Sequence, residues 1–213
     1  MNKGRKLGYA FDKETQDSLS PVEAIQILKE GNLRFVENKR LNRDLHIQKD
    51  HTSGGQYPFA ALLGCIDSRV PAELVFDLGI GDIFNTRIAG NFINEDILGS
   101  LEFACKVAGS KVIVVLGHTH CGAVKGVCDD VELGNLTNML AKIKPAVNAV
   151  THIEGERNSS NKAFVQAVAD KNVLIAIENI KKNSHVLKEM LDNNEIAIVG
   201  GMYDIETGEV AFV

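Results

Sequence analysis

The sequence predicts an α/β fold with a mostly parallel central sheet, flanking helices and an antiparallel C-terminal strand. Apolar runs that read as strands, at residues 59–65, 82–87 and 112–116, alternate with segments of helical periodicity. The run at 112–116 is Val-Ile-Val-Val-Leu, with no polar residue between, which is typical of a central parallel strand covered on both faces. A chain of 213 residues, 45% hydrophobic and 24% charged, suits one globular domain with a sizeable core.

The first helix is predicted from its start signal. Ser20 and Glu23 have the spacing of a capping box, and Pro21 stands at the first helical position. Apolar residues then recur near helical spacing, so the helix should run to about Asn38. Residues 39–56 are polar and lack periodicity, and we expect a long loop there.

These N-terminal elements are expected to form an arm on a single domain that spans residues 1–213. The arm covers residues 1–56, and the α/β core covers residues 57–213. An apolar helix followed by a long polar loop finds burial more easily on a partner than on its own core. We therefore expect the N-terminal helix to pack on a partner subunit.

The rest of the chain continues the alternation and ends in a hairpin. One predicted helix carries an amphipathic stripe that stops at a glycine, Gly109. The closing strands are separated by a Thr-Gly turn at residues 207–208. The remaining expected elements are helices at 71–78, 97–108, 134–150 and 161–192 and strands at 195–202 and 209–213.

Composition excludes several classes of function. The net charge is -5, and lysines and arginines are scattered, so no nucleic-acid partner is expected. The basic start at residues 1–7 is not followed by a long apolar stretch, which argues against a signal peptide and a membrane span. Four cysteines do not form a dense disulfide framework. We expect a cytoplasmic protein with no membrane partner.

Three metal-binding side chains follow two of the predicted strands. Cys65 ends the first strand, and His118 and Cys121 follow the run at 112–116. Ligands in such folds bind beyond the carboxyl ends of the strands. Two thiolates and one imidazole make three zinc ligands, and three ligands with an open position are typical of a catalytic zinc. The sequence predicts one Zn²⁺ per chain that activates water.

Other interpretations of these residues exist. A cysteine at a strand end is usually a small buried hydrophobe, and His-x-x-Cys can be a redox or core pair. Their joint placement after two buried strands favours zinc. His120 is a competing imidazole, but its side chain should diverge from that of His118, and the His-x-x-Cys spacing suits chelation.

Asp67 and Arg69 are the candidate catalytic residues. They follow Cys65 at two-residue spacing, so an extended backbone would direct all three side chains to one face. Arg69 can pair with Asp67 and keep it ionised. Asp67 can then accept a hydrogen bond from a zinc-bound water or hydroxide and orient it towards an electrophile. An Asp-x-Arg pair is, however, usually a surface salt bridge.

The motif Cys-Ile-Asp-Ser-Arg at residues 65–69, together with Gly-His-Thr-His-Cys-Gly at 117–122, resembles the β-class carbonic anhydrases. The likeness extends over most of the chain. It implies zinc on the two cysteines and His118, a catalytic Asp67–Arg69 dyad, and reversible hydration of carbon dioxide to bicarbonate and a proton through a zinc-bound hydroxide.

The resemblance also implies a substrate pocket and an assembly. Members form dimers, often paired into tetramers, with the site at the dimer interface and the N-terminal helix on the neighbouring subunit. The expected hydrogen-bond partner of the substrate is Gln56. The residues expected to line an apolar pocket for carbon dioxide are Phe84, Ile88, Ala89 and Gly90.

The sequence departs from the pattern of the β class in three places. Phe103 replaces a common tyrosine, and Ala123 replaces the second of two glycines. The chain has no tryptophan, so a bicarbonate-binding regulatory pocket that uses one cannot be built. We therefore expect, near neutral pH, an open site in which Asp67 is paired with Arg69.

Two alternatives to carbon dioxide hydration remain open at this point. The first is a related zinc hydrolase that acts on carbon disulfide or carbonyl sulfide. The second is a non-enzymatic zinc or redox-binding module, which needs a fourth protein ligand or a Cys65–Cys121 disulfide. The Asp67–Arg69 pair argues against the second, because a structural site does not need a water-orienting carboxylate.

Overall fold

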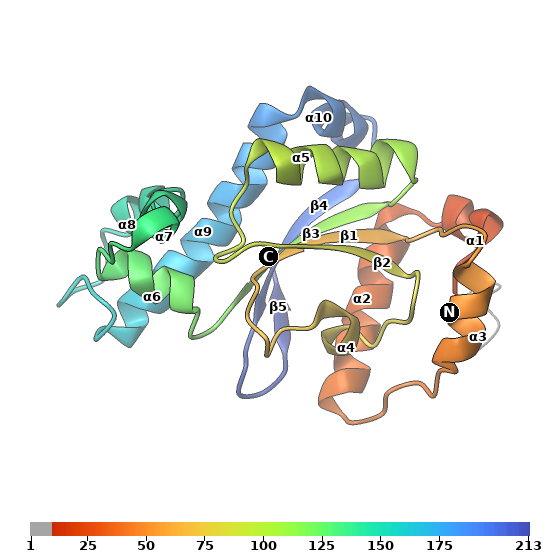
Figure 1. Cartoon of the computed structure of the whole chain (residues 1–213), viewed down its shortest axis with the longest axis horizontal. Helices are drawn as coiled ribbons and strands as arrows, with labels where there is room; N and C mark the ends of the chain where they lie inside the picture. The colour runs from red at the N-terminus through yellow and green to blue at the C-terminus, as the bar shows by residue number, and fades with distance from the viewer. Residues whose placement is uncertain (1–9) are drawn as a thin grey trace.

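The computed structural model describes residues 10–213, and the basic segment at residues 1–7 lies outside the described part. Its centre is a five-stranded sheet in the order β2-β1-β3-β4-β5 (Figure 1). The first four strands of this order are parallel, and β5 runs antiparallel to β4. The predicted fold class is confirmed. The strands are β1 Ala60–Gly64, β2 Ile83–Arg87, β3 Val112–His118, β4 Ala197–Tyr203 and β5 Val210–Phe212.

Helices cover both faces of this sheet. In Figure 1, α5 and α10 lie on one side of the strands, and α2 and α4 lie on the other. The α-helices are α1 Lys13–Ser18, α2 Pro21–Val36, α3 Leu45–Thr52, α4 Ala72–Val75, α5 Glu95–Glu102, α6 Gly122–Cys128, α7 Gly134–Leu140, α8 Lys144–Ala149, α9 Lys162–Asn183 and α10 His185–Asp192. A π-helical turn, Phe103–Val107, extends α5 to Gly109, where the backbone turns left-handed. None of the helices in residues 10–213 is long and apolar enough to cross a membrane.

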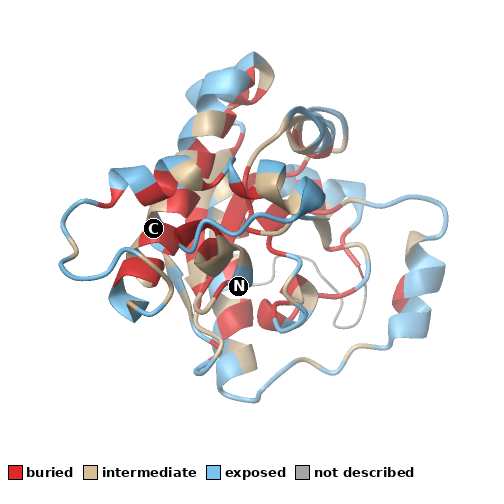
Figure 2. Ribbon diagram, turned by 60° about the vertical axis from the view of Figure 1, so that its left-hand side comes forward, coloured by how far each residue is buried: buried red, intermediate tan, exposed pale blue. Residues whose placement is uncertain are grey.

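Each central strand contributes to two separate cores because its side chains alternate between the faces of the sheet. On β1, Ala60 and Leu62 pack with the residues of α2 and α4, whereas Ala61 and Leu63 pack with those of α5, α9 and α10. The residues of β3 divide in the same way. Figure 2 shows the buried residues gathered along the sheet and on the helix faces turned towards it. This double coverage explains the unbroken apolar sequence of β3.

The N-terminal arm differs from the expectation in one respect. Ala24 and Leu28 of α2 are fully buried against the core of their own chain, so the argument that this helix finds burial more easily on a partner was wrong. Gly31 allows α2 to lie close to the backbone of Phe76, since a Cβ at this position would lie 1.9 Å from the carbonyl oxygen of Phe76. The opposite face leaves Val22 75% and Leu33 56% exposed. Packing of that face on a partner subunit stays a prediction.

Three short helices, α1, α3 and α6, occupy segments in which no helix is predicted. Helix α3 lies within the expected loop at residues 39–56 and begins at Asp44, whose side chain accepts hydrogen bonds from the backbone of His46 and Ile47. Helix α1 buries Gln16, which donates to the carbonyls of Pro58 and Ala108. Helix α3 buries Gln48, which accepts from the backbone of Ile80. Helices α1 and α3 are held by hydrogen bonds of buried glutamines, so the sequence shows no apolar periodicity that would predict them.

Candidate metal centre

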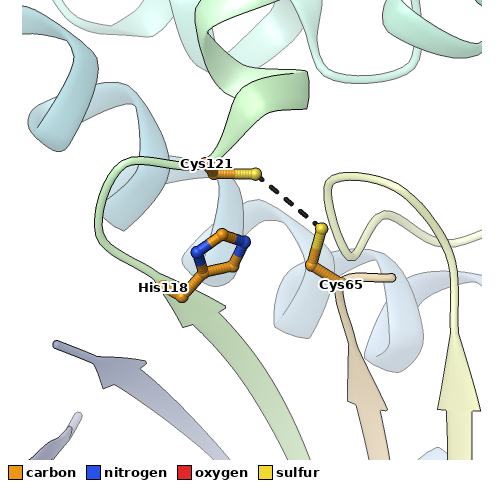
Figure 3. Close-up of side chains that lie close together, drawn as sticks. All are labelled: Cys65, His118 and Cys121. Atoms are coloured by element: carbon orange, nitrogen blue, oxygen red, sulfur yellow. Dashed lines mark hydrogen bonds between the residues drawn. The ribbon is translucent and has the colours of Figure 1, made fainter. Parts of the chain in front are cut away.

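The three predicted ligands meet at the carboxyl edge of the sheet. Cys65 directly follows β1, His118 is the last residue of β3, and Cys121 is the N-cap of α6. Strands β1 and β3 are parallel neighbours with Gly64 opposite Leu116, so their ends lie side by side. Figure 3 shows the two thiols and the imidazole turned towards one another. The ligand atoms of these buried residues lie within 4.8 Å of each other.

The spacing of the two sulfur atoms fits a tetrahedral metal ion. Their Sγ atoms are 3.9 Å apart. Zinc–sulfur bonds of about 2.3 Å in a tetrahedron would separate two sulfur atoms by about 3.8 Å. Together with His118, they make the only group of three or more potential metal ligands found in residues 10–213. Three protein ligands leave the fourth position for a water molecule or substrate.

The imidazole of His118 is set up as a ligand by its neighbour. Its Nδ1 lies 2.9 Å from the carbonyl oxygen of Thr119 and donates to it. This tautomer leaves a lone pair on Nε2. The Nε2 atom is buried and has no hydrogen-bond partner in the described chain. A buried acceptor without a partner is costly, and a bound cation beside the two thiols would satisfy it.

The two thiols are joined by a hydrogen bond that shifts the pKa of each in an opposite direction. A hydrogen bond from Cys121 to the Cys65 sulfur lowers the pKa of Cys65 to about 4, and the backbone N–H of Gly90 adds a second bond at 3.4 Å. The same bond to Cys65, together with burial, raises the pKa of Cys121. A divalent cation would displace the protons of the two thiols and bind both residues as thiolates.

Asp67 and Arg69 lie next to this group as a bidentate pair. Arg69 donates from Nε to Oδ1 at 2.9 Å and from a terminal nitrogen to Oδ2 at 2.7 Å. These bonds hold the pKa of Asp67 well below its usual range. The Oδ2 atom is 3.9 Å from Nε2 of His118, so the carboxylate borders the metal position. The pairing is the one expected for an open site.

The backbone that brings this pair together is a turn and not the expected extended segment. The Asp67 carbonyl accepts from the N–H of Val70, and its side chain accepts from the N–H of Arg69 at 2.9 Å. An aspartate that bonds the backbone two residues on is a standard turn device. Alternation of side chains along a strand was therefore the wrong reason for a correct pairing.

Arg87 is a site residue for which sequence reasoning predicted no role. It ends β2, and its guanidinium donates to the carbonyl of Cys65 at 2.8 Å and to that of Asp67. It thus fixes the backbone between the predicted ligand Cys65 and the carboxylate of Asp67. The sequence signal that could have identified Arg87 is its position at the carboxyl end of a predicted strand, where site residues are expected.

The predicted pocket residues fall into two groups. Ile88, Ala89 and Gly90 follow β2 at the edge that carries the ligands, and Gly90 bonds Cys65 directly. Phe84 lies within β2, where its ring meets that of Phe103 edge to face at 6.1 Å between centroids. These positions suit an apolar wall.

Gln56 does not approach the metal site of its own chain. It precedes β1, whereas Cys65 follows it. The strand is five residues long and spans about 16 Å. A contact between Gln56 and the substrate therefore requires the site of another subunit.

The other histidine of the motif and the two remaining cysteines stay outside the ligand group. His120 has a left-handed backbone, and its Nε2 lies 3.4 Å from a carboxylate oxygen of Glu206. Its side chain therefore diverges from His118, as the spacing predicts. Burial raises the pKa of Cys105 to about 12 and that of Cys128 to about 11. Both have the properties of packed core residues.

Comparison with known proteins agrees with this geometry. A family model described as carbonic anhydrase matches residues 60–210. Carbonic anhydrase 2 of Mycobacterium tuberculosis is 34% identical over 197 residues, covering 89% of this chain and 91% of that protein. The carbonic anhydrase of Mycolicibacterium smegmatis is 34% identical over 192 residues, covering 90% and 92%. A crystal structure of a tetrameric β-carbonic anhydrase from Sordaria macrospora is similar with a TM-score of 0.66 and 26% identity, covering 76% of this chain and 83% of that one.

Proposed function

This chain belongs to the carbonic anhydrase family, in its β class, and we propose that Cys65, His118 and Cys121 hold the zinc ion with which it hydrates carbon dioxide. The observation that carries the proposal is the buried Nε2 of His118, which has no hydrogen-bond partner in the described chain and lies within 4.8 Å of the sulfur atoms of Cys65 and Cys121. Two sulfur donors and one imidazole suit zinc, whereas magnesium and calcium prefer oxygen ligands. When bound, zinc lowers the pKa of a coordinated water to about 7 and so supplies a nucleophile at neutral pH.

The role of Asp67 follows from its protonation state. Held as a carboxylate by Arg69, it can accept hydrogen bonds but cannot donate them. A water molecule beside the metal position must therefore direct an O–H towards Asp67, which leaves an oxygen lone pair free to face the carbon of carbon dioxide. Arg69 holds the carboxylate in two bonds and prevents it from rotating. Arg87 keeps the backbone of the loop in place while the reaction proceeds.

The substrate pocket is part of the proposal. Carbon dioxide is small and has no net dipole, so an apolar wall of Phe84, Ile88, Ala89 and Gly90 suits it. Gln56 would supply the polar contact from a neighbouring subunit, because it lies at the other end of β1 from the site of its own chain. The outer edge of β2 has no strand partner among residues 10–213, which leaves that side of the sheet available to such a neighbour.

Self-association has further support in the exposed apolar side chains. Val22 and Leu33 extend from the outer face of α2, and Phe103 and Val107 extend from the π-helical turn. Exposed apolar patches often mark interaction sites. The solved relative from Sordaria macrospora is described as tetrameric. We expect a dimer or a tetramer here.

A reducing location fits the cysteines. All four are free and buried. Structural disulfides form in oxidising compartments and are rare in the cytosol. A cytoplasmic location is therefore part of the proposal.

Stopped-flow measurement of carbon dioxide hydration tests the function. Protein with about one zinc per chain should accelerate the pH change, and chelation should abolish the acceleration. A Cys65→Ser variant that has lost the metal is the matched control. Zinc-loaded protein that does not accelerate hydration would overturn the proposed function, and parallel assays with carbonyl sulfide and carbon disulfide would then identify a related hydrolase.

A further inference from the structure

A buried amide on α9 is connected to the metal site through one glycine. Asn172 is 3% exposed, and its Nδ2 donates to the carbonyl oxygen of Gly90 at 2.8 Å. The N–H of the same glycine donates to the sulfur of Cys65 at 3.4 Å. We propose that Asn172 is a positioning residue of the metal centre, which acts through Gly90 on Cys65. The inference rests on the proposed function, since it requires that the site binds a metal ion.

Gly90 needs such an anchor because of its conformation. Its φ is +80°, in the left-handed region, and a Cβ would lie 2.3 Å from Cδ1 of Ile143 and 3.2 Å from Cβ of Ala123. Glycine is therefore required, and glycine is also the residue with the most backbone freedom. The packing of Ile143 restrains it on one side, and the hydrogen bond from Asn172 fixes its carbonyl. Both restraints aim the N–H at Cys65.

The next residue of α9 contacts the segment that carries the second ligand. A Cβ on Gly117 would lie 2.7 Å from Cγ2 of Val173, and Gly117 immediately precedes His118. Adjacent residues of one helix thus contact Gly90, which donates to Cys65, and the backbone next to His118. Helix α9 is 22 residues long and packs against β3 and β4. The helix is therefore in contact with the support of one ligand and with the segment that carries another.

The hydrogen bond from the N–H of Gly90 to the sulfur of Cys65 has a direct chemical consequence. A hydrogen bond to a thiolate fixes the direction of its lone pairs and disperses part of its charge. Outer partners that orient metal ligands typically account for about 10–100-fold in metal affinity. Because Asn172 acts through one intervening residue, we expect the lower end, about a tenfold increase in the zinc dissociation constant when its amide is removed.

The experiment compares Asn172→Ala and Asn172→Leu with Asn32→Ala in the full chain. Asn32 is a matched control because it is 7% exposed and its Nδ2 also donates to backbone carbonyls, those of Val75 at 3.1 Å and Gly208 at 2.9 Å. Its partners lie outside the loops that carry the ligands. Leucine approximately keeps the volume at position 172 and removes the polar amide, including the donor to Gly90, so a cavity is not the cause of its effect.

Two measurements separate positioning from a merely structural role. Zinc affinity is measured by competition with a chelator, and thiolate-to-metal charge transfer is measured in the cobalt(II) form. Both Asn172 variants should bind zinc about tenfold more weakly and show an altered cobalt band. Asn32→Ala should lower the thermal midpoint while its zinc affinity stays within about twofold of the wild type.

The possible outcomes are distinct. Asn172 variants with wild-type zinc affinity and cobalt spectrum would overturn the inference alone, even if they are less stable. Failure of both variants to fold in the presence of zinc would also overturn it, since a structural role then suffices. A wild-type chain that binds neither zinc nor cobalt would overturn the proposed function together with this inference.

Discussion

Removal of the metal should measurably destabilise the folded chain. The perturbation is a chelator that strips the site formed by Cys65, His118 and Cys121. Without a cation, the buried Nε2 of His118 has no partner in the described chain, and an unsatisfied buried group costs about 1–3 kcal/mol. The ligands come from two separate segments, so the unfolded chain does not present them together. Zinc bound at this site would therefore stabilise the native state selectively.

The size of the effect follows from mass action. Free zinc at about 100 times its dissociation constant stabilises the native state by about 2.7 kcal/mol. For a chain of 213 residues, each kcal/mol raises the thermal midpoint by about 2–4 °C. The zinc-loaded protein should therefore melt about 5–11 °C above the chelated protein. The unpartnered Nε2 of His118 is consistent with this gain in stability, because zinc binding would remove the cost of leaving that nitrogen unsatisfied.

Scanning calorimetry, with elemental analysis of the same samples, measures this difference. His118→Ala and Cys65→Ser should bind no zinc and show no rise in melting temperature. His120→Ala is the matched control and should retain both zinc and the shift, because its side chain turns towards Glu206. Freshly purified protein without zinc, and with no shift on zinc addition, would refute the metal centre. Loss of zinc in His120→Ala would show that the wrong histidine was chosen.

Four further predictions concern the surrounding residues. Asp67→Asn should keep its zinc but lose about 10–100-fold in stopped-flow hydration, because the amide lacks the charge and can present its NH2 group instead; near-normal turnover would exclude the orienting role. Arg69→Ala should lose a similar amount with zinc content unchanged, and full activity would show that Asp67 needs no partner. Light scattering should report a dimer or a larger even-numbered oligomer, and Gln56→Ala should slow hydration without loss of zinc; an active monomer would contradict both. Iodoacetamide should spare Cys105 and Cys128 in the folded zinc protein at pH 8, because burial raises their pKa to about 12 and about 11 and so keeps them as thiols; rapid labelling detected by mass spectrometry would contradict this.

The sequence predicted the sheet well because its apolar runs are strong local signals. The strands fall within one to two residues of their predicted bounds, and the ligands stand at their ends as expected. The two short N-terminal helices were not predicted because Gln16 and Gln48 anchor them by hydrogen bonds, which a hydrophobic pattern does not report. The packing of α2 on its own core was not predicted for a different reason. It depends on the close approach of Gly31 to the backbone of Phe76.

The candidate metal-ligating residues could be predicted from the sequence, but the residues that hold them in position could not. The types and spacing of Cys65, His118 and Cys121 suffice for the metal hypothesis. The contacts of Arg87 and Asn172 depend on which backbone carbonyls the fold brings within reach, and a single sequence contains no such information. The turn at Asp67 shows the same limit, since spacing alone could not distinguish it from an extended strand.

The pairing of β1 with β3 makes a three-ligand metal site depend on the completed centre of the sheet. These strands are parallel neighbours whose connection includes α4, β2 and α5, so their ends meet only after a long crossover is in place. Before that, His118 and Cys121 offer two ligands and Cys65 is distant. Zinc added to the unfolding chain would thus retard the loss of a completed sheet, whereas zinc added during refolding would not speed its nucleation. A bound ion would stabilise the completed sheet, and its rate of uptake would report when the centre of the sheet has formed.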